Sequence, residues 1–394
     1  MAKISGRLEK IKPSVTLAVT QKAQELRSRG EDVISFSAGE PDFSTPEHIV
    51  EAAKKALDQG KTRYTPVAGI PELRQAVAAQ SEEVRSVGCK PEQVIITVGA
   101  KHALYGFFQA VLDPGDQVVI PTPYWVSYPD QVLLAGGEPV YFETTAKNNW
   151  ILTPQDLEKI ASPKTKVVII NTPSNPTGGL YSREATEAIT EKALSMGLWI
   201  ITDEIYRDLI YDGAKHVSPL SVASDRAERV FVVDGVSKTY AMTGWRIGWG
   251  IGDPDVIKAM SKIQGQSTSN PAAMAQAAAL AAITTPADFL PGWVREYKER
   301  RDVIVEGLAA MPGVECVTPR GAFYVLPDVT AVLERMGGGV TDVDLATLLL
   351  EKALVATVPG SAFGAPGHLR FSYATSMDAI EAGIIRVGET LAKL

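Results

Sequence analysis

The chain has 394 residues, 45% of them hydrophobic and 22% charged, and a formal net charge of −7 at pH 7. This composition excludes disordered and collagen-like classes, and the lack of a basic excess argues against a nucleic-acid partner. Cys89 and Cys316 are too few for a disulfide framework and lack metal-ligand spacing, which predicts a reducing compartment and no metal site.

The apolar runs outside an alanine-rich stretch at 271–283 are short. Runs such as 167–170 and 198–201 fall far below the roughly 20 residues that a membrane span needs. Residues 1–14 hold basic side chains with no apolar stretch behind them, unlike a secretory signal. We therefore expect a soluble, cytoplasmic protein with no membrane partner, in which 271–283 forms a buried helix.

The predicted elements begin with a helix over 15–29 and a Gly- and Pro-rich turn at 37–42. Short β-branched runs then alternate with amphipathic helical stretches through the middle of the chain. This alternation, with nearly continuous apolar strands, predicts an α/β fold with a mostly parallel sheet covered by helices on both faces. The predicted strands are 94–98, 117–120, 167–170, 199–202, 229–233 and 246–250, and the helices among them include 103–112 and 183–196.

The two ends of the chain differ from the middle. The C-terminal part opens with a long charged helix at 293–311 and ends in a small strand-containing region. Since neither end is large enough for its own core, we expect both to pack together as one small α+β domain. The predicted division is 1–45 for an N-terminal arm and part of the small domain, 46–290 for the large domain, and 291–394 for the rest of the small domain.

Sheets of this kind bind ligands at the carboxyl ends of their strands, so the residues there are informative. At the first such end, Gly99, Ala100 and Lys101 open a helix whose N-terminal N–H groups suit a phosphate, although an ordinary strand–helix turn has the same pattern. At the second, prolines stiffen the loop 171–178 and would hold the amide of Asn175 at the sheet edge. A loop punctuated by Pro and Gly is the alternative there.

Two further strand ends carry ionisable groups. Asp203 ends an apolar strand, where a lone carboxylate is costly unless a cation meets it, and capping of the next helix is the alternative role. Tyr206 follows three residues later and would share its face in a helical turn. Lys238 also follows a strand, where lost solvation lowers the pKa of its amine and makes it nucleophilic toward a carbonyl. Ser237 and Arg246 flank it, and both are phosphate-binding types.

Together these strand ends supply a phosphate site, a carboxylate, a tyrosine, an amide and a nucleophilic lysine. A phosphorylated, cationic heteroaromatic aldehyde would match all of them, and pyridoxal 5′-phosphate is that molecule. A nicotinamide dinucleotide matches less well, because it explains neither the lysine nor the missing G-x-G-x-x-G pattern.

Eight motifs in order along the chain carry a family resemblance: KPS at 12–14, AGEPDF at 38–43, YTPVAGIPELR at 64–74, PYWVSY at 123–128, NPTG at 175–178, DEIY at 203–206, SK…GWRIG at 237–248 and RFSY at 370–373. With them the chain resembles the fold-type I aminotransferases, and among these the bacterial aspartate aminotransferases of subgroup Iβ. The resemblance implies transfer of the amino group of L-aspartate to 2-oxoglutarate with pyridoxal 5′-phosphate. Some members of the subgroup also transaminate prephenate to arogenate.

The resemblance also implies roles for individual residues. Lys238 would bind the cofactor covalently and act as the general base, and Asp203 would pair with the protonated pyridine nitrogen. Tyr206 and Asn175 would hydrogen-bond the ring oxygen, and Trp125 would stack on the ring. The phosphate would be held by Gly99, Ala100, Lys101, Ser237 and Arg246.

The resemblance further implies which residues bind the substrate and which one reaches the neighbouring subunit. Arg370 would hold the substrate α-carboxylate. The residues assisting at that end would be Gly39, Asn175 and Trp125. Lys101 and Thr16 would bind the distal carboxylate of a dicarboxylic substrate, and Lys12 would bind the second carboxylate of prephenate, with a solvated arm residue as its alternative reading. Tyr64 would reach the phosphate in the neighbouring site, which implies a homodimer with shared active sites.

Other outcomes remain open at the level of sequence. Alanine and aromatic aminotransferases, C–S lyases and cyclopropane-forming synthases reuse the same cofactor residues. A ligand-sensing regulator is disfavoured, because no DNA-binding domain fits ahead of residue 37 and the net charge is acidic.

Overall fold

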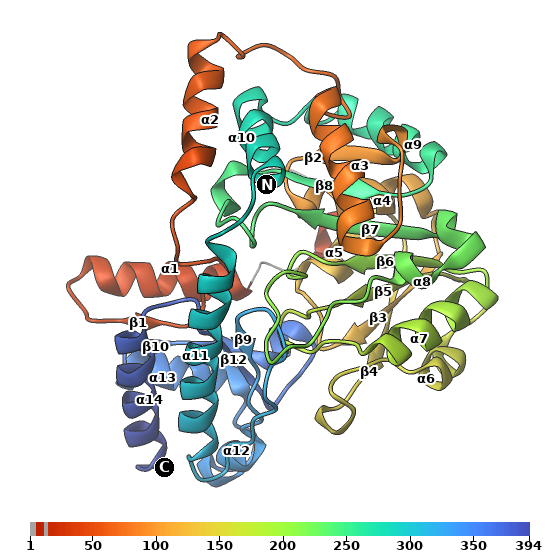
Figure 1. Cartoon of the computed structure of the whole chain (residues 1–394). Helices are drawn as coiled ribbons and strands as arrows, with labels where there is room; N and C mark the ends of the chain where they lie inside the picture. Colours follow the sequence, from red (N-terminus) through yellow and green to blue (C-terminus); the bar gives the residue numbers. More distant parts are fainter. Residues whose placement is uncertain (1–4, 12–14) are drawn as a thin grey trace.

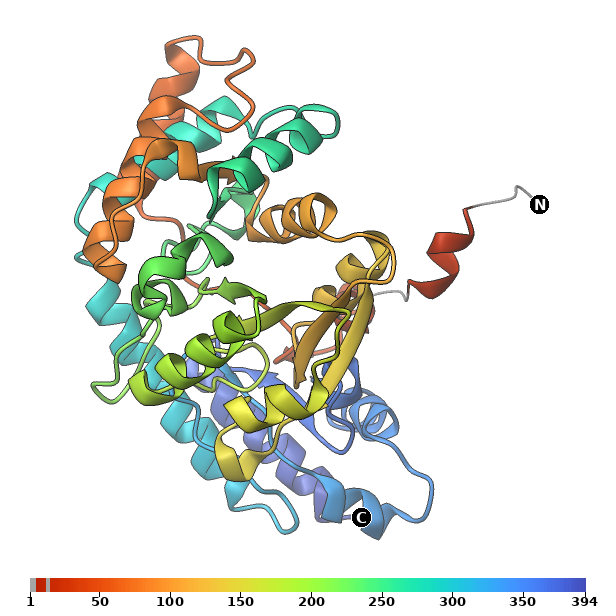
Figure 2. The same cartoon turned by 90° about the vertical axis from the view of Figure 1, so that its right-hand side faces the viewer.

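The computed structural model describes residues 5–11 and 15–394, and a seven-stranded sheet forms its centre (Figures 1 and 2). Its strands are β2 (Val94–Thr97), β3 (Gln117–Thr122), β4 (Glu138–Glu143), β5 (Thr165–Asn171), β6 (Trp199–Asp203), β7 (Val230–Gly235) and β8 (Gly248–Ile251). They lie in the order β2-β8-β7-β6-β5-β3-β4. Neighbours are parallel except at β8, which runs antiparallel to β2 and β7. The predicted α/β fold with a mostly parallel sheet is confirmed.

The six predicted strands all occur in this sheet, with ends that differ by a few residues. The pattern does not predict β4, because this edge strand is exposed or half-buried and lacks the apolar run of a central strand. β8 begins at Gly248 and not at the predicted residue 246. The reason is that Arg246 has a left-handed φ of 57° after a short 3-10 helix, η5 (Thr243–Trp245).

Alternate side chains of the central strands enter two hydrophobic cores, one on each face of the sheet. Val168 and Ile170 of β5 belong to one core, and Val167 and Ile169 to the other. All four are at most 1% exposed, which explains the continuous apolar run of the strand. The first core is covered by α3 (Pro71–Arg85), α7 (Arg183–Ser195) and α10 (Ala273–Thr284), and the second by α4 (Ala100–Val111), α5 (Ser127–Leu134) and α9 (Pro254–Gly265).

Local sequence sets where these helices begin. The side chain of Ser182 accepts the backbone N–H of Ala185 and caps α7, and Asp253 caps α9 in the same manner ahead of Pro254. α4 has no side-chain cap and follows Gly99 at the carboxyl edge of the sheet. Its N-terminus is therefore available to a ligand.

The segment that carries β1, near the start of the chain, lies beside the C-terminal part of the chain (Figure 1). β1 (Ile34–Ser35) pairs in parallel with β10 (Val355–Ala356). A second small sheet has β12 (Leu369–Ser372) at its centre, between β11 (Val358–Pro359) and β9 (Tyr324–Val325). The pairing of β1 with β10 agrees with the expected packing of the ends, while the division at 45/46 and 290/291 stays a prediction. The remaining elements include α1 (Val15–Ser28), α2 (Glu47–Asp58), α6 (Pro154–Ile160), α8 (Pro219–Val222), α11 (Leu290–Ala309), α12 (Thr330–Met336), α13 (Asp342–Lys352) and α14 (Met377–Leu391).

Among the described helices, none combines the length and the apolar character needed to cross a lipid bilayer.

Candidate active site

A cavity of about 410 Å³ opens at the carboxyl ends of the parallel strands, between them and the segments that carry β9 and β12. Trp125 and Asn175 enter it from the loops that follow β3 and β5, whereas Arg370 enters from β12. The sequence places these residues far apart, and the topology brings them together because parallel strands end at one edge. The predicted site residues that line it are Gly39, Ala100, Lys101, Trp125, Asn175, Asp203, Tyr206, Ser237, Lys238, Arg246 and Arg370.

Lys238 lies in the loop after β7, and its Nζ donates a 2.5 Å hydrogen bond to the carbonyl oxygen of Gly39. The pKa of this amine is lowered to about 8, chiefly by loss of solvation and also by the positive charges of Arg246 and Arg370. The carboxylates of Glu40 and Asp203 oppose the shift. An amine with this pKa is partly uncharged near neutral pH, so it can act as a nucleophile and as a proton acceptor.

Asp203 is the last residue of β6 and is 5% exposed. The phenol of Tyr128 donates a 2.7 Å hydrogen bond to its Oδ2, and the N–H of Ile205 donates to its Oδ1 at 3.3 Å. Burial raises the pKa of this carboxyl to about 6, and these two hydrogen bonds only partly offset the rise. No described Lys, Arg or His forms an ion pair with it. A cationic group at this wall of the cavity would complete the charge balance.

Arg370 is a buried guanidinium whose hydrogen-bond partners among the described residues are all neutral. Its Nη1 donates to Asn175 Oδ1 at 3.1 Å and its Nη2 donates to the Ser37 carbonyl at 2.8 Å, whereas its Nε has no partner in the part of the chain that the structure describes. The guanidinium carbon lies 4.5 Å from the ring centroid of Tyr324 and 4.9 Å from that of Phe363. Burial lowers the pKa of this group. Such a cation, held by neutral groups inside a cavity, forms a site for an anion.

The tyrosines and the asparagine loop frame the same cavity. Tyr206 Oη lies 2.9 Å from Tyr324 Oη, and burial raises the pKa of both phenols, so both stay protonated. The N–H of Asn175 donates to Asn171 Oδ1 at 2.9 Å, and Asn171 Nδ2 donates to the carbonyl of Asp203 at 3.0 Å. The loop that presents Asn175 is thereby fixed to the strand that presents Asp203.

The N-terminus of α4 and Arg246 form the end of the cavity suited to a phosphate. Gly99 has a φ of 77°, and a Cβ placed there would lie 2.4 Å from Arg246 Nη2. Arg246 is held by hydrogen bonds from Nη1 to the Thr243 carbonyl at 2.8 Å and from Nη2 to the Val98 carbonyl at 3.5 Å. A glycine at position 99 therefore lets the guanidinium approach the helix N-terminus, where cation and helix dipole both favour an anion.

Lys101 and Trp125 form a neighbouring wall of the cavity. Lys101 Nζ lies 4.9 Å from the centroid of the Trp125 ring. Burial lowers the pKa of this amine, and the charge of Arg246 lowers it further. No described carboxylate forms an ion pair with Lys101, so the cavity has a further cation without an acidic partner.

Four predicted residues are not among those that line this cavity. Tyr64 is 90% exposed and does not line it. Lys12 and the side chain of Thr16 lie outside the described part of the chain, although Thr16 falls within α1 and Thr20 of the same helix lines the cavity. Gly99 is not a lining residue, although it directly precedes Ala100, which lines the cavity.

Other lining residues are not among the predicted site residues. Tyr128 belongs to the motif at 123–128 and lies three residues after Trp125, so its motif could have drawn attention to it. Glu40 belongs to the motif at 38–43 in the same way, whereas Tyr324 and Thr243 lie outside the residues that the motifs spell out. The Thr243 hydroxyl donates to Glu40 Oε2 at 2.7 Å and ties the Gly39–Glu40 turn to the loop before β8. No group of three or more His, Cys, Asp or Glu suited to a metal ion occurs within 5–11 and 15–394.

Comparison with known proteins gives full-length matches. A family model described as aminotransferase class I and II matches residues 31–386. The chain is 47% identical over 385 residues to an aspartate aminotransferase of Geobacillus stearothermophilus, with 98% of each chain covered. It is 44% identical over 396 residues to an aspartate/prephenate aminotransferase of Thermus thermophilus, with 100% of each covered.

Comparison with solved structures also gives matches over the full length of the chain. The aspartate aminotransferase from Rhizobium meliloti matches with a TM-score of 0.96 at 38% identity, covering 100% of both chains. The Thermus thermophilus aspartate aminotransferase with maleate matches with a TM-score of 0.92 at 44% identity, covering 99% of this chain and 100% of that one.

Proposed function

The chain belongs to the class I and II aminotransferases, and we propose that it transfers the amino group of L-aspartate to 2-oxoglutarate with pyridoxal 5′-phosphate as its resident cofactor. One observation carries this proposal. A single cavity holds an amine with a lowered pKa (Lys238), a buried carboxylate (Asp203) and a buried guanidinium (Arg370), and no described residue forms an ion pair with the carboxylate or the guanidinium.

The residues present fit the proposed cofactor. Ser237, Arg246 and the α4 N-terminus would hold its phosphate, and Asp203 would meet its pyridinium nitrogen. Asn175 and Tyr206 would hydrogen-bond its ring oxygen, and the indole of Trp125 would cover its ring. Lys238 would bind its aldehyde. When bound, the cofactor supplies an electron sink for negative charge at the substrate Cα.

Asp203 and Lys238 would divide the proton chemistry. A cation beside Asp203 lowers the pKa of the carboxyl from its value of about 6, so the carboxylate stays ionised and keeps the ring nitrogen protonated. Lys238, freed when the substrate amine replaces it, would remove the proton from Cα and return it on the other side of the transferred nitrogen. Its lowered pKa places it close to neutral pH, where such a base works best.

Arg370 and Lys101 would select a dicarboxylic substrate. Arg370 offers a planar fork to the α-carboxylate, and this orientation directs loss of the Cα proton and not of the carboxylate. Lys101 is a further cation without an acidic partner in the described structure, and it would meet the distal carboxylate. The aspartate aminotransferase names of the relatives and the maleate-bound Thermus thermophilus structure support this assignment.

Prephenate is the second acceptor that we propose, since relatives of equal coverage are named aspartate/prephenate aminotransferases. Lys12 and Thr16 would contribute to the binding of the carboxylate at the far end of the acceptor. Tyr64, whose side chain is exposed, would reach the phosphate of a partner's site in a homodimer.

The test combines a spectrum with an assay. The purified chain incubated with pyridoxal 5′-phosphate should develop a visible absorption band, and borohydride should then leave an adduct on Lys238. Aspartate with 2-oxoglutarate should give oxaloacetate in a coupled assay, with alanine, phenylalanine and cystathionine as competing substrates. The variant Lys238→Ala should show neither the visible absorption band nor turnover of aspartate. The variant Lys54→Ala, at an exposed lysine on α2, should keep both the band and the turnover. Unchanged turnover in Lys238→Ala, or faster turnover of cystathionine, would contradict the proposal.

A further inference from the structure

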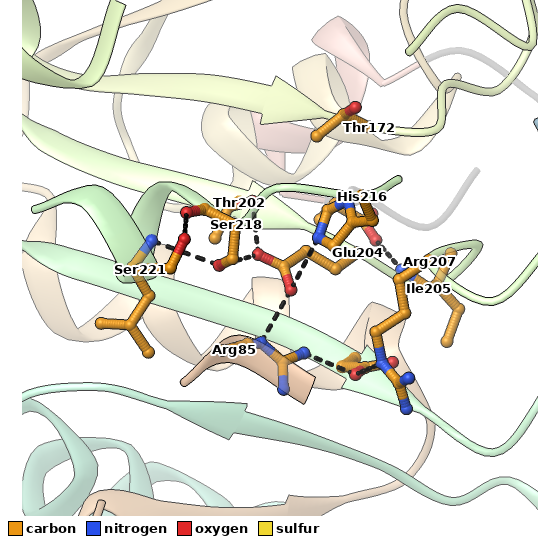
Figure 3. Close-up of polar contacts among 12 residues, drawn as sticks. Arg85, Thr172, Thr202, Glu204, Ile205, Arg207, His216, Ser218 and Ser221 are labelled. Atoms are coloured by element: carbon orange, nitrogen blue, oxygen red, sulfur yellow. Dashed lines mark hydrogen bonds and ion pairs between the residues drawn. The ribbon is translucent and has the colours of Figure 1, made fainter. Parts of the chain in front are cut away.

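A buried ion network lies next to Asp203, and Figure 3 shows Arg85, Glu204 and Arg207 of this network. Arg85, Glu204 and Asp234 are its centre, with side chains that are 1%, 0% and 2% exposed. They come from α3, from the residue after β6, and from β7. None of these three residues lines the cavity.

Arg85 bridges the two carboxylates. Its Nε donates to Glu204 Oε2 at 2.8 Å, and its Nη2 donates to Asp234 Oδ2 at 2.7 Å. The guanidinium therefore spans the ends of two adjacent parallel strands, one of which also ends in Asp203. A lysine amine could not make both bonds in this geometry, because it is a point charge and not a planar fork.

The network continues from Asp234 toward the lysine loop. Arg207 Nε donates to the same Oδ2 of Asp234 at 2.7 Å, and Arg207 also forms an ion pair with Asp208. The hydroxyl of Thr239 donates to Asp208 Oδ2 at 2.8 Å. Thr239 directly follows Lys238, and Glu204 directly follows Asp203. The two ends of the network are thus each one residue away from a group of the proposed reaction.

The remaining contacts of Glu204 show how closely its carboxylate is held. Thr202 Oγ1 donates to its Oε1 at 3.0 Å, Ser218 also donates to Oε1, and His216 Nε2 lies 3.2 Å from its Oε2. The pKa of Glu204 is lowered, with Arg85 the largest of the causes that outweigh burial. Removal of Arg85 would leave the Glu204 and Asp234 carboxylates without their shared cation, next to Asp203.

We propose that Arg85 is a positioning residue for the transamination described above: by bridging Glu204 and Asp234 it fixes Asp203 relative to Lys238 and neutralises these two carboxylates. The expected loss of catalysis in an Arg85 variant rests on the proposed function. The expected change in electrostatics does not, because it concerns charges that the chain carries with or without cofactor.

The charges around Asp203 and Lys238 decide the direction in which the pKa values of these two groups should change when Arg85 is replaced. Asp203 faces Tyr128, Glu204 and Asp234, and Lys238 faces Glu40, Arg246, Arg370 and Asp203. Arg85→Met leaves negative charge without its shared cation next to Asp203, and the carboxylate of Asp203 in turn faces Lys238. Negative charge favours the protonated form, so the pKa of each group should rise.

The first measurement uses the cofactor-loaded enzyme. In Arg85→Met, the pH midpoint of the visible band should rise by about one unit, and kcat with aspartate should fall about ten-fold or more. KM for aspartate should change by less than about three-fold, because Arg85 contacts neither cavity nor substrate. Arg85→Lys should restore the midpoint to within about 0.3 units but not kcat, since the charge returns without the bridge.

The second measurement removes the dependence on cofactor. Reductive methylation of Lys238 by formaldehyde and cyanoborohydride, followed by peptide mass spectrometry across pH, should show the same upward shift in the cofactor-free Arg85→Met chain. A wild-type chain with no visible band and no turnover would refute the proposed function, whereas this labelling shift would still test the network.

Two further variants distinguish the proposed effect of Arg85 from a general loss of folding stability. Arg301→Met removes an equally buried arginine, 3% exposed and 2.6 Å from Asp212, and should lower thermal stability without moving either midpoint. Arg85→Met/Glu204→Gln removes one charge of each sign and should return both midpoints toward wild type, even where Arg85→Met alone is insoluble. The proposal is overturned if Arg85→Met keeps the wild-type midpoints, if Arg301→Met shifts them equally, or if the double variant stays as shifted as the single one.

Discussion

Tyr128 makes two contacts that join the carboxylate and the indole of the site. Its phenol donates a 2.7 Å hydrogen bond to Asp203 Oδ2, and its ring meets that of Trp125 edge-on, with centroids 5.3 Å apart at 76°. Burial raises the pKa of this phenol well above its ordinary value, so it remains a donor. One side chain therefore sets the direction of the carboxylate and supports the ring proposed to cover the cofactor.

Tyr128→Phe should isolate the hydrogen bond, because phenylalanine keeps the edge contact with Trp125. Loss of a bond to a charged acceptor is worth about 1.5–3 kcal/mol, so kcat with aspartate should fall about ten- to hundred-fold. The matched control is Tyr181→Phe, which removes a buried hydroxyl that accepts the Leu152 N–H at 2.9 Å outside the main cavity. This control should lower thermal stability alone. Equal activity losses in the two variants would show that Tyr128 has no particular link to Asp203.

Asp203→Asn should have opposite effects on the stability of the cofactor-free chain and of the cofactor-loaded chain. In the cofactor-free chain the pKa of Asp203 is raised from 3.8 to about 6, so the folded state bears the cost of an ionised, buried carboxylate above pH 6. That cost is absent below about pH 4, where the carboxyl is neutral in both folded and unfolded chains. The shift corresponds to about 3 kcal/mol.

Asparagine imitates the neutral acid, so the variant without cofactor should be more stable than wild type at pH 8 and equal to it near pH 4. With cofactor the advantage should reverse, because the carboxylate then meets a cation. Denaturant unfolding at the two pH values, with and without cofactor, measures both effects. If the cofactor-free variant is less stable than wild type at pH 8, then burial of the ionised Asp203 carboxylate does not destabilise the folded chain.

The residues that sequence reasoning could place are those whose position follows from strand ends. Asp203 and Lys238 each follow an apolar run, and because parallel strands end at one edge, that local pattern is enough to bring them together. Arg85 could not be found this way. Its contact with Glu204 spans 119 residues and joins a helix end to a strand end, and no local pattern encodes it.

Other features escape the sequence for equally physical reasons. Tyr324 enters the cavity from a two-residue strand of the small sheet, which is too short to show a periodicity. β4 is an edge strand without a continuous apolar run. The partner contact expected of Tyr64 belongs to an assembly and not to one chain.

Gly99→Ala should weaken cofactor retention through a steric contact. The new Cβ would lie 2.4 Å from Arg246 Nη2, and the φ of 77° at this position already disfavours any side chain. Gly197→Ala is the matched control, since its φ of 73° imposes a similar backbone strain while no atom of the described residues lies within 4 Å of the added Cβ. Both variants should lose about 1 kcal/mol of stability.

Only Gly99→Ala should raise the Kd for pyridoxal 5′-phosphate, by about ten-fold or more, because Arg246 must move away from the α4 N-terminus. Dialysis followed by absorbance of the retained cofactor measures this difference. Equal retention of cofactor by the two variants would show that Arg246 does not contribute to phosphate binding.

Lys101→Ser should change substrate preference more than overall catalysis. The amine lies at the cavity wall over Trp125, without an acidic partner in the described structure, and a charge-assisted contact with a distal carboxylate is worth about 1.5–3 kcal/mol. The kcat/KM for aspartate should therefore fall about ten- to hundred-fold, while that for phenylalanine, which has no distal carboxylate, should stay within about three-fold. Lys258→Ser, at an exposed position on α9, is the control for a lost surface charge and should alter neither value. Equal losses for the two substrates would mean that Lys101 supports the cofactor site and does not read the substrate, because only a contact with the distal carboxylate can separate aspartate from phenylalanine.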